Sequence, residues 1–202
     1  MTGITSSTAL WYASRATGVV TLLLLTAVVL LGILVNRQGR LPGLPGFAVT
    51  GLHRNVSLLA VAFLAIHVVT AIADPYVTIG LAAAVLPFAS AYKPIWLGLG
   101  AISLDLVAAL ILTSLARARM SRRAWRAIHW LGYAAWPLAV VHSIGSSADA
   151  RSGLVLGVLV ACVLATVAAL AWRLSQAARE IPRAGRAAAA LNRMSARKAG
   201  LR

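Results

Sequence analysis

The sequence contains five apolar stretches, each long enough to cross the hydrocarbon core of a membrane. They lie near residues 17–36, 54–74, 95–116, 125–145 and 152–174. A spanning helix needs about 20 apolar residues at helical rise, and in lipid only helices and closed barrels satisfy their own backbone groups. Of the 202 residues 60% are hydrophobic and 11% charged, unlike a soluble domain. We therefore expect an all-α membrane protein, with a bundle of about five transmembrane helices in residues 1–174 and a basic tail over residues 175–202.

Basic residues are distributed unevenly between the two sides of the predicted bundle. Of the 19 Lys and Arg residues, all fall in loop 37–54, in loop 117–126, or in the tail and the end of the helix before it (from Arg173 on), except Arg15, Lys93 and Arg151. Because cytoplasmic loops carry an excess of basic residues, we expect a multi-pass protein of the plasma membrane with its N-terminus outside and its C-terminus in the cytoplasm. This topology and the anionic lipids of the bilayer account for the charge, so we expect no nucleic-acid partner.

All four histidines of the chain belong to two of the predicted helices. His53 and His67 lie 14 residues apart in the second, and His129 and His142 lie 13 residues apart in the fourth. Both helices run from inside to outside, and each spacing covers about 20 Å of helix. The histidines therefore form two levels, with His53 and His129 at the cytoplasmic one and His67 and His142 at the outer one.

Two opposed imidazoles are the ligands that a six-coordinate haem iron needs. A single histidine in a membrane helix is more often a hydrogen-bonded residue of the helix interface, but four histidines paired at matching depths favour ligation. Cys162 is the only cysteine, which excludes the paired-cysteine motif that attaches haem covalently. The pattern predicts two stacked b-type haems.

The second histidine spacing fits an ideal helix less well than the first. Fourteen steps of about 100° bring His67 to within about 40° of His53, whereas thirteen steps leave His142 about 140° from His129. Pro137 lies between the second pair. We expect a kink or a tightened turn there to make up part of the difference.

Several charged residues are candidates for further roles at these levels. Basic side chains can pair with haem propionates, although anchoring at the membrane surface also explains each of them. The candidates are Arg37, Arg40, Arg54 and Arg126 near the cytoplasmic level, and Lys93 and Arg151 near the outer level. Asp105 lies in the middle of the third helix, where an ionised carboxylate is costly. It is either a neutral acid bonded to a neighbouring helix or a proton or quinone contact.

The segments around the histidines resemble the ferric-reductase-like transmembrane domain superfamily. They are HRNVSLLAVAFLAIH from His53, DPYVTIGL from Asp74 and AWRAIHWLGYAAWPLAVVH from Ala124. The superfamily includes NADPH oxidases, ferric reductases and the membrane haem subunit of the bacterial methionine sulfoxide reductase system. The resemblance covers about residues 10–148 and is greatest to short stand-alone actinobacterial members. It implies iron ligation by the same two histidine pairs, and we assign no catalytic side chain.

The resemblance also implies a cytochrome b that transfers electrons across the membrane, as the haem-binding subunit of an oxidoreductase. Relatives often carry a cytoplasmic domain for flavin and nicotinamide, whereas here the fifth predicted helix is followed by a basic tail of about thirty residues. We therefore expect a separate donor, either a cytoplasmic flavin reductase or membrane quinol. The acceptor is a ferric chelate, oxygen or an extracytoplasmic flavoprotein. Two alternatives stay open: a quinone-linked cytochrome b with reverse flow, and a non-catalytic haem-binding or partner-recruiting membrane scaffold.

Overall fold

The computed structural model describes residues 2–36, 45–75, 77, 79–147 and 153–199. The described residues form helices joined by short connections, and no strand occurs among them. This confirms the all-helical class expected from the sequence. The chain divides into two units, Met1–Val163 and Leu164–Arg202, and the first unit holds all four histidines.

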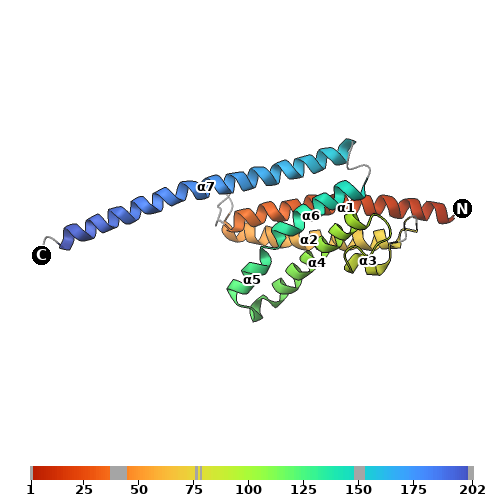
Figure 1. Cartoon of the computed structure of the whole chain (residues 1–202), viewed down its shortest axis with the longest axis horizontal. Coiled ribbons are helices and arrows are strands. Elements are labelled where there is room, and N and C mark those ends of the chain that lie inside the picture. The colour runs from red at the N-terminus through yellow and green to blue at the C-terminus, as the bar shows by residue number, and fades with distance from the viewer. Residues whose placement is uncertain (1, 37–44, 76, 78, 148–152, 200–202) are drawn as a thin grey trace. The chain divides into compact units, whose positions relative to one another are not determined.

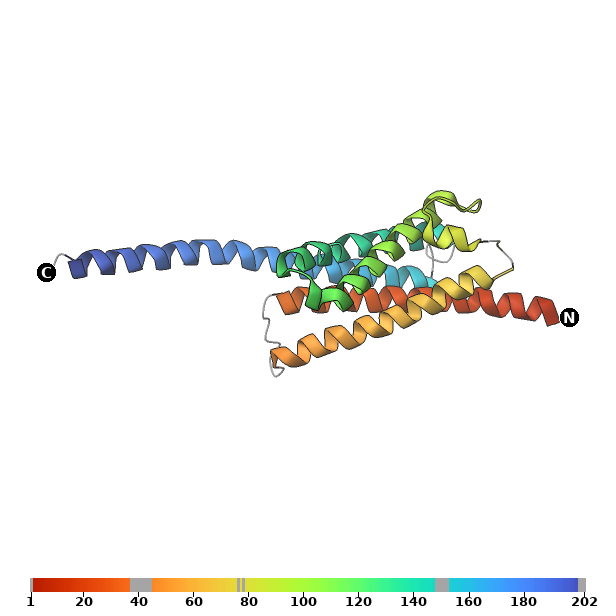
Figure 2. The same ribbon diagram turned by 90° about the horizontal axis from the view of Figure 1, so that it is seen from below.

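Helices α1 (Thr2–Asn36) and α2 (Gly46–Ala73) lie side by side in the first unit (Figures 1 and 2). Both contain a segment long and apolar enough to cross a membrane. Helix α1 begins well before the expected residue 17, because no proline interrupts its polar first turns. This extension brings the backbone of Ser14 next to α2.

Helix α4 (Pro94–Leu115) follows the short helix α3 (Leu81–Val85) and ends in the 3-10 turn η1 (Ala116–Arg119). Pro94 stands in the first turn of α4, where a missing N–H costs no hydrogen bond. The connection before it packs closely on α4, since the ring of Phe88 fills the space that a Cβ at Gly98 would need. Segment 94–119 is another candidate membrane span.

The expected span 125–145 is divided between two helices, α5 (Arg122–His129) and α6 (Gly132–Ser146). Between them three backbone N–H groups bond to the carbonyl three residues earlier: Leu131 to Ile128 (2.9 Å), Tyr133 to Trp130 (3.0 Å) and Ala134 to Leu131 (2.9 Å). A 3-10 turn advances about 120° per residue instead of about 100°. The expected tightening therefore occurs before Pro137, and it rotates His142 toward the side of the bundle that His129 faces.

Helix α7 (Gly153–Ala199) covers the expected span 152–174 from Gly153 onward and continues as a helix into the basic tail as far as Ala199. Its first residues, up to Val163, belong to the first unit. There Leu159 packs with Leu22 of α1 and Val140 of α6, next to Trp136. Four candidate membrane spans are found among the described residues, in α1, α2, α4 with η1, and α7.

The first unit is built from two helix pairs, α1 with α2 and α4 with α6. Helices α4 and α6 are joined by a hydrogen bond from Ser103 Oγ to the carbonyl of Ala135 (2.9 Å). The two pairs meet mainly where α1 contacts α6, and Trp136 Nε1 donates to Thr26 Oγ there (2.9 Å). Helices α2 and α6 run in the same direction (Figure 2), and α5 directly precedes α6. His53 and His129 therefore come before His67 and His142 along the bundle.

Candidate functional site

The four histidines face one another as two pairs. The ring centres of His53 and His129 are 6.4 Å apart, with 66° between the ring planes. Those of His67 and His142 are 6.5 Å apart, with 74° between the planes. Each pair takes one ring from α2, and its partner ring comes from α5 or α6. No group of three or more His, Cys, Asp or Glu side chains that could hold a metal ion is found in the described part of the chain.

The ring separation at both levels fits a single metal ion between two imidazoles. A metal–imidazole bond is about 2 Å long and the ligating nitrogen lies about 1.1 Å from the ring centre, which gives about 6.3 Å between two rings on opposite sides of one ion. Edge-to-face contact between aromatic rings falls in the same range. The two explanations differ in where the ring nitrogens point.

The hydrogen bonds of His67 and His142 turn one nitrogen of each ring away from the partner ring. Nδ1 of His67 lies 2.8 Å from the carbonyl oxygen of Ser14, and Nδ1 of His142 lies 2.8 Å from that of Trp96. A carbonyl only accepts hydrogen bonds, so each Nδ1 carries the proton and each Nε2 keeps its lone pair. Backbone carbonyls orient metal-ligating histidines in this way. The arrangement therefore favours ligation over ring contact alone.

Three of the histidine rings lie against a glycine of a neighbouring helix. A Cβ at Gly18 would be 3.0 Å from Cε1 of His67, and one at Gly32 would be 3.5 Å from Cε1 of His53. On α4, a Cβ at Gly100 would be 2.6 Å from Nδ1 of His142. The glycines let the backbones approach closely, as small residues do in membrane helix interfaces. We call Gly18, Gly32 and Gly100 the glycine seats.

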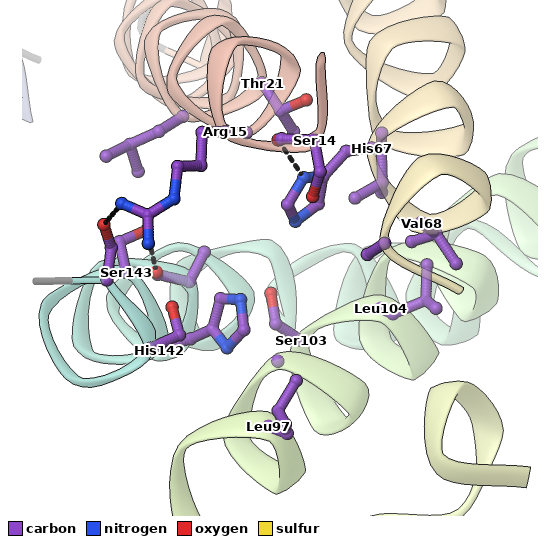
Figure 3. Close-up of a pocket in the computed structure, with 18 of the residues that line it drawn as sticks. Ser14, Arg15, Thr21, His67, Val68, Leu97, Ser103, Leu104, His142 and Ser143 are labelled. Carbon is purple, nitrogen blue, oxygen red and sulfur yellow. Dashed lines mark hydrogen bonds between the residues drawn. The ribbon is translucent and has the colours of Figure 1, made fainter. Parts of the chain in front are cut away.

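A cavity of about 280 Å³ lies at the level of His67 and His142. Figure 3 shows the two rings on its walls, with Arg15 of α1 beside them. Most of the lining is apolar, and besides the two histidines its polar side chains include Ser14, Arg15, Thr21, Asp74, Tyr92, Ser103, Ser143, Ser146 and Ser147. Arg15 Nη1 donates to Ser147 Oγ (2.9 Å), and its guanidinium lies 4.0 Å from the ring centre of Trp11. An apolar cavity with a few placed polar groups is the usual form of a cofactor site.

The His53–His129 level is built differently. Nδ1 of His53 and Nδ1 of His129 are buried without a hydrogen bond among the described residues. The backbone of Val28 interacts with His53, but not with the geometry of a hydrogen bond. The ring of His129 stacks on Trp125, with 4.6 Å between ring centres and 23° between planes. Buried polar atoms without partners are rare in folded proteins and point to a group that binds here.

The charged candidates predicted from the sequence lie in different surroundings. Arg37, Arg40 and Arg151 are outside the described residues. Arg54 and Arg126 are exposed, on α2 and α5. Lys93 Nζ donates to the carbonyls of Gly145 (3.2 Å) and Ser146 (3.1 Å), where it caps the last turn of α6. Asp105 is exposed on α4 and does not line the cavity.

The site also contains residues that the sequence alone did not indicate. Arg15 was counted only for topology, and a helix starting at residue 17 placed it in a terminal segment. A signal for the glycine seats was present, because Gly18 and Gly32 are separated by the same 14 residues as His53 and His67. No comparable signal marks Trp125.

The family described as ferric reductase like transmembrane component matches residues 17–140, which is more than half of the chain. The chain belongs to this family. The matched ferric-reductase-like segment contains His53, His67 and His129, and His142 follows two residues after it. Comparison with curated proteins and with solved structures gives no match. Membership in the ferric-reductase-like family, together with four candidate spans, makes the chain a membrane protein with a domain of membrane electron transfer.

Proposed function

We propose that the chain is a dihaem b-type membrane cytochrome, which passes electrons from a donor on the cytoplasmic side to an acceptor outside. The observation that carries this proposal is the pair of ring separations, 6.4 Å for His53–His129 and 6.5 Å for His67–His142. Both match two imidazoles on opposite sides of one metal ion. Haem is the metal group that takes exactly two protein ligands of this kind and carries electrons through a membrane domain.

The side chains hold such a group in four ways. The paired imidazoles would supply two ligands to the iron of each haem. The carbonyls of Ser14 and Trp96 fix the Nδ1-protonated form of two of the ligands. The glycine seats leave space for the rings. The apolar helices exclude water from the path between the levels. When bound, haem supplies the one-electron chemistry that no side chain here provides.

Arg15 is the basic residue best placed to meet a haem propionate at the His67–His142 level. It lines the cavity, and its guanidinium is held between Ser147 and the Trp11 ring. Guanidinium groups form strong charge-assisted hydrogen bonds with carboxylates. Lys93 is not among the residues that line this cavity, and its Nζ donates to the carbonyls of α6. We therefore assign this role to Arg15 before Lys93.

The direction of transfer follows from the distribution of arginines. Arg117, Arg119, Arg122, Arg123 and Arg126 are all exposed around η1 and α5, at the end of the bundle nearer His53 and His129. By the positive-inside rule this end faces the cytoplasm of a plasma-membrane protein. A flavin reductase or quinol would then deliver electrons to the His53–His129 haem. A ferric chelate, oxygen or an extracytoplasmic flavoprotein would take them from the His67–His142 haem.

Haem analysis of the purified chain tests the proposal. We expect two b-type haems per chain by pyridine haemochrome assay, both low-spin in the oxidised and dithionite-reduced states. A chain purified in native-like lipid with haem supplied during expression, yet holding none, would overturn the proposal. A stable five-coordinate high-spin iron would contradict axial ligation by histidine pairs.

A quinone-linked cytochrome b with reverse flow is the second candidate. Asp105 favours it, because an exposed carboxylate in the middle of α4 faces the lipid in which quinone dissolves, where a charge is costly without a function. Reduction of both haems by a quinol analogue, with no reduction by any flavin reductase, would favour this candidate.

A further inference from the structure

His129 differs from the other three histidines in what holds its ring. His53, His67 and His142 each lie against a glycine seat, whereas none of the described glycines has His129 as its neighbour. His129 also lacks the Nδ1 hydrogen bond that orients His67 and His142. Its described ring contacts are the facing His53 and the stacked Trp125.

The stack on His129 has a second layer. The guanidinium carbon of Arg117 lies 4.4 Å from the ring centre of Trp125, which is cation–π geometry. Trp125 and His129 are four residues apart on α5 and so share one face of that helix. Arg117 comes from η1, on the other side of the turn where Ser121 begins α5 by accepting a hydrogen bond from the N–H of Ala124 (3.2 Å).

We propose that Trp125 and Arg117 are positioning residues for the haem ligand His129, and that they raise the reduction potential of the haem at this level. The inference rests on the proposed function. The flat contact with Trp125 restricts rotation of the His129 imidazole about its Cβ–Cγ bond. At His67 and His142 a glycine seat and a backbone carbonyl restrict the ring in the same way. Arg117 adds a positive charge beside Trp125, at the level where this haem would bind. The oxidised haem carries one more positive charge than the reduced haem, so this charge favours the reduced state.

The angle between the two ligand rings gives this proposal a spectroscopic signature. His53 and His129 stand at 66° to each other. When two axial imidazoles are nearly perpendicular, neither iron π-type orbital is favoured, and the low-spin ferric haem has a strongly anisotropic electron paramagnetic resonance (EPR) signal. Rotation of one ring toward the plane of the other lowers this anisotropy. Loss of the Trp125 stack should therefore change the signal of one haem only.

The experiment compares matched variants of the full-length protein with haem bound. Trp125→Leu removes the stack and Trp125→Phe keeps a flat ring, while Trp130→Leu removes an exposed neighbouring tryptophan as the control. Arg117→Gln removes the stacked charge, and Arg119→Gln removes an equally exposed charge of the same turn. A His53→Ala variant identifies the EPR signal that belongs to this level. Each protein is measured by EPR and by potentiometric titration.

We expect Trp125→Leu to shift or broaden the signal of the His53–His129 haem, or to lose that haem alone, and Trp125→Phe to restore it. We expect Arg117→Gln to lower the reduction potential of the same haem, with Arg119→Gln and Trp130→Leu close to the unaltered protein. Unchanged signals in Trp125→Leu would overturn the positioning role. Equal shifts from Arg117→Gln and Arg119→Gln would overturn the specific role of the stacked charge.

Two further outcomes separate this inference from the proposed function. If the unaltered protein shows no pair of low-spin signals, the proposed function fails, and this inference fails with it. If the unaltered protein shows both signals and the variants behave like their controls, the inference fails alone. If Trp125→Leu does not fold, two measurements still test the inference. They are the comparison of Arg117→Gln with Arg119→Gln and the EPR spectrum of Trp125→Phe.

Discussion

Gly100 on α4 lies directly against the imidazole of His142 on α6. A Cβ at Gly100 would be 2.6 Å from Nδ1 and 2.7 Å from Cε1 of that ring. The same Nδ1 bonds to the carbonyl of Trp96, one turn earlier on α4. The glycine therefore permits both the position of the ring and the hydrogen bond that orients it.

Gly100→Ala should disturb the His67–His142 level and spare the other. The added methyl group must displace the ring of His142, which costs about 1–3 kcal/mol for overpacking in a tight interface. We expect one haem per chain, or one haem with an altered spectrum, by haemochrome assay and optical spectroscopy. Gly51→Ala is the matched control, because a Cβ at Gly51 meets nothing within 4 Å. Two unaltered haems in Gly100→Ala would contradict the role of this seat.

Single histidine substitutions should remove the haems one level at a time. We expect His67→Ala or His142→Ala to lose one haem of two, and His53→Ala or His129→Ala to lose the other. The levels are about 20 Å apart along the helices, so each retains its own ligands. Difference spectra with redox titration would identify which haem remains. Loss of both haems from all four variants would indicate one shared site.

Arg15 and Lys93 should respond differently to loss of charge. Arg15→Gln should alter the spectrum or the retention of the His67–His142 haem, because Arg15 lines that cavity. Lys93→Gln should leave that haem intact and lower the free energy of unfolding by about 1–2 kcal/mol, since two carbonyls at the end of α6 lose their donor. Haem content and thermal unfolding, measured on both variants, check this. The reverse result would return the propionate role to Lys93.

Electron transfer should proceed in one direction and require a separate donor. In sealed vesicles of known orientation, NAD(P)H alone should leave the haems oxidised. A flavin reductase added on the arginine-rich side should reduce them, and then an acceptor on the opposite side. Oxidation of NAD(P)H by the purified chain itself would reveal a further cofactor site. Reduction only from the side of Lys93 would reverse the assigned direction.

Asp105→Asn should leave both haems in place, because Asp105 is exposed on α4 and does not line the cavity. The amide removes the ability to release a proton while it keeps the size of the side chain. Haem content would be measured beside turnover with a quinol donor and with a flavin reductase. If Asp105→Asn turns over more slowly than the unaltered protein with quinol but not with the flavin reductase, a quinone or proton contact is supported. If its rates equal those of the unaltered protein with both donors, that hypothesis is wrong.

The order of the helices and the position of most spans followed from the sequence, because a membrane helix needs a long apolar run. Their lengths did not, since α1 and α7 both extend beyond their apolar runs. The histidine pairs could likewise be proposed from spacing, since His53 and His67 lie on the single helix α2 and His129 and His142 lie on the consecutive helices α5 and α6. The break at Trp130–Leu131 could not be located. Pro137 was the obvious place for a distortion, whereas the tight turns span residues 128–134, three to nine residues earlier, where no proline or glycine pair marks them.

The four histidines could be predicted from the sequence, but the residues that contact their rings could not. Which glycine lies against which ring depends on how neighbouring helices are rotated, and the apolar faces of membrane helices leave that rotation undefined. The contact between Trp125 and Arg117 depends on the fold of the η1 turn. Arg15 was missed because α1 extends beyond the apolar run that defined it.

Neither helix pair holds a complete ligand set. The α1–α2 pair contributes His53 and His67 with their seats, and the other two ligands come from the chain that follows α4. Direct contact between these halves runs mainly through α1 and α6. A group bound at either level would therefore act as a cross-link between two otherwise weakly joined half-proteins. Assembly of the bundle and binding of the cofactor would then be coupled. A cell short of haem would contain little of the folded protein.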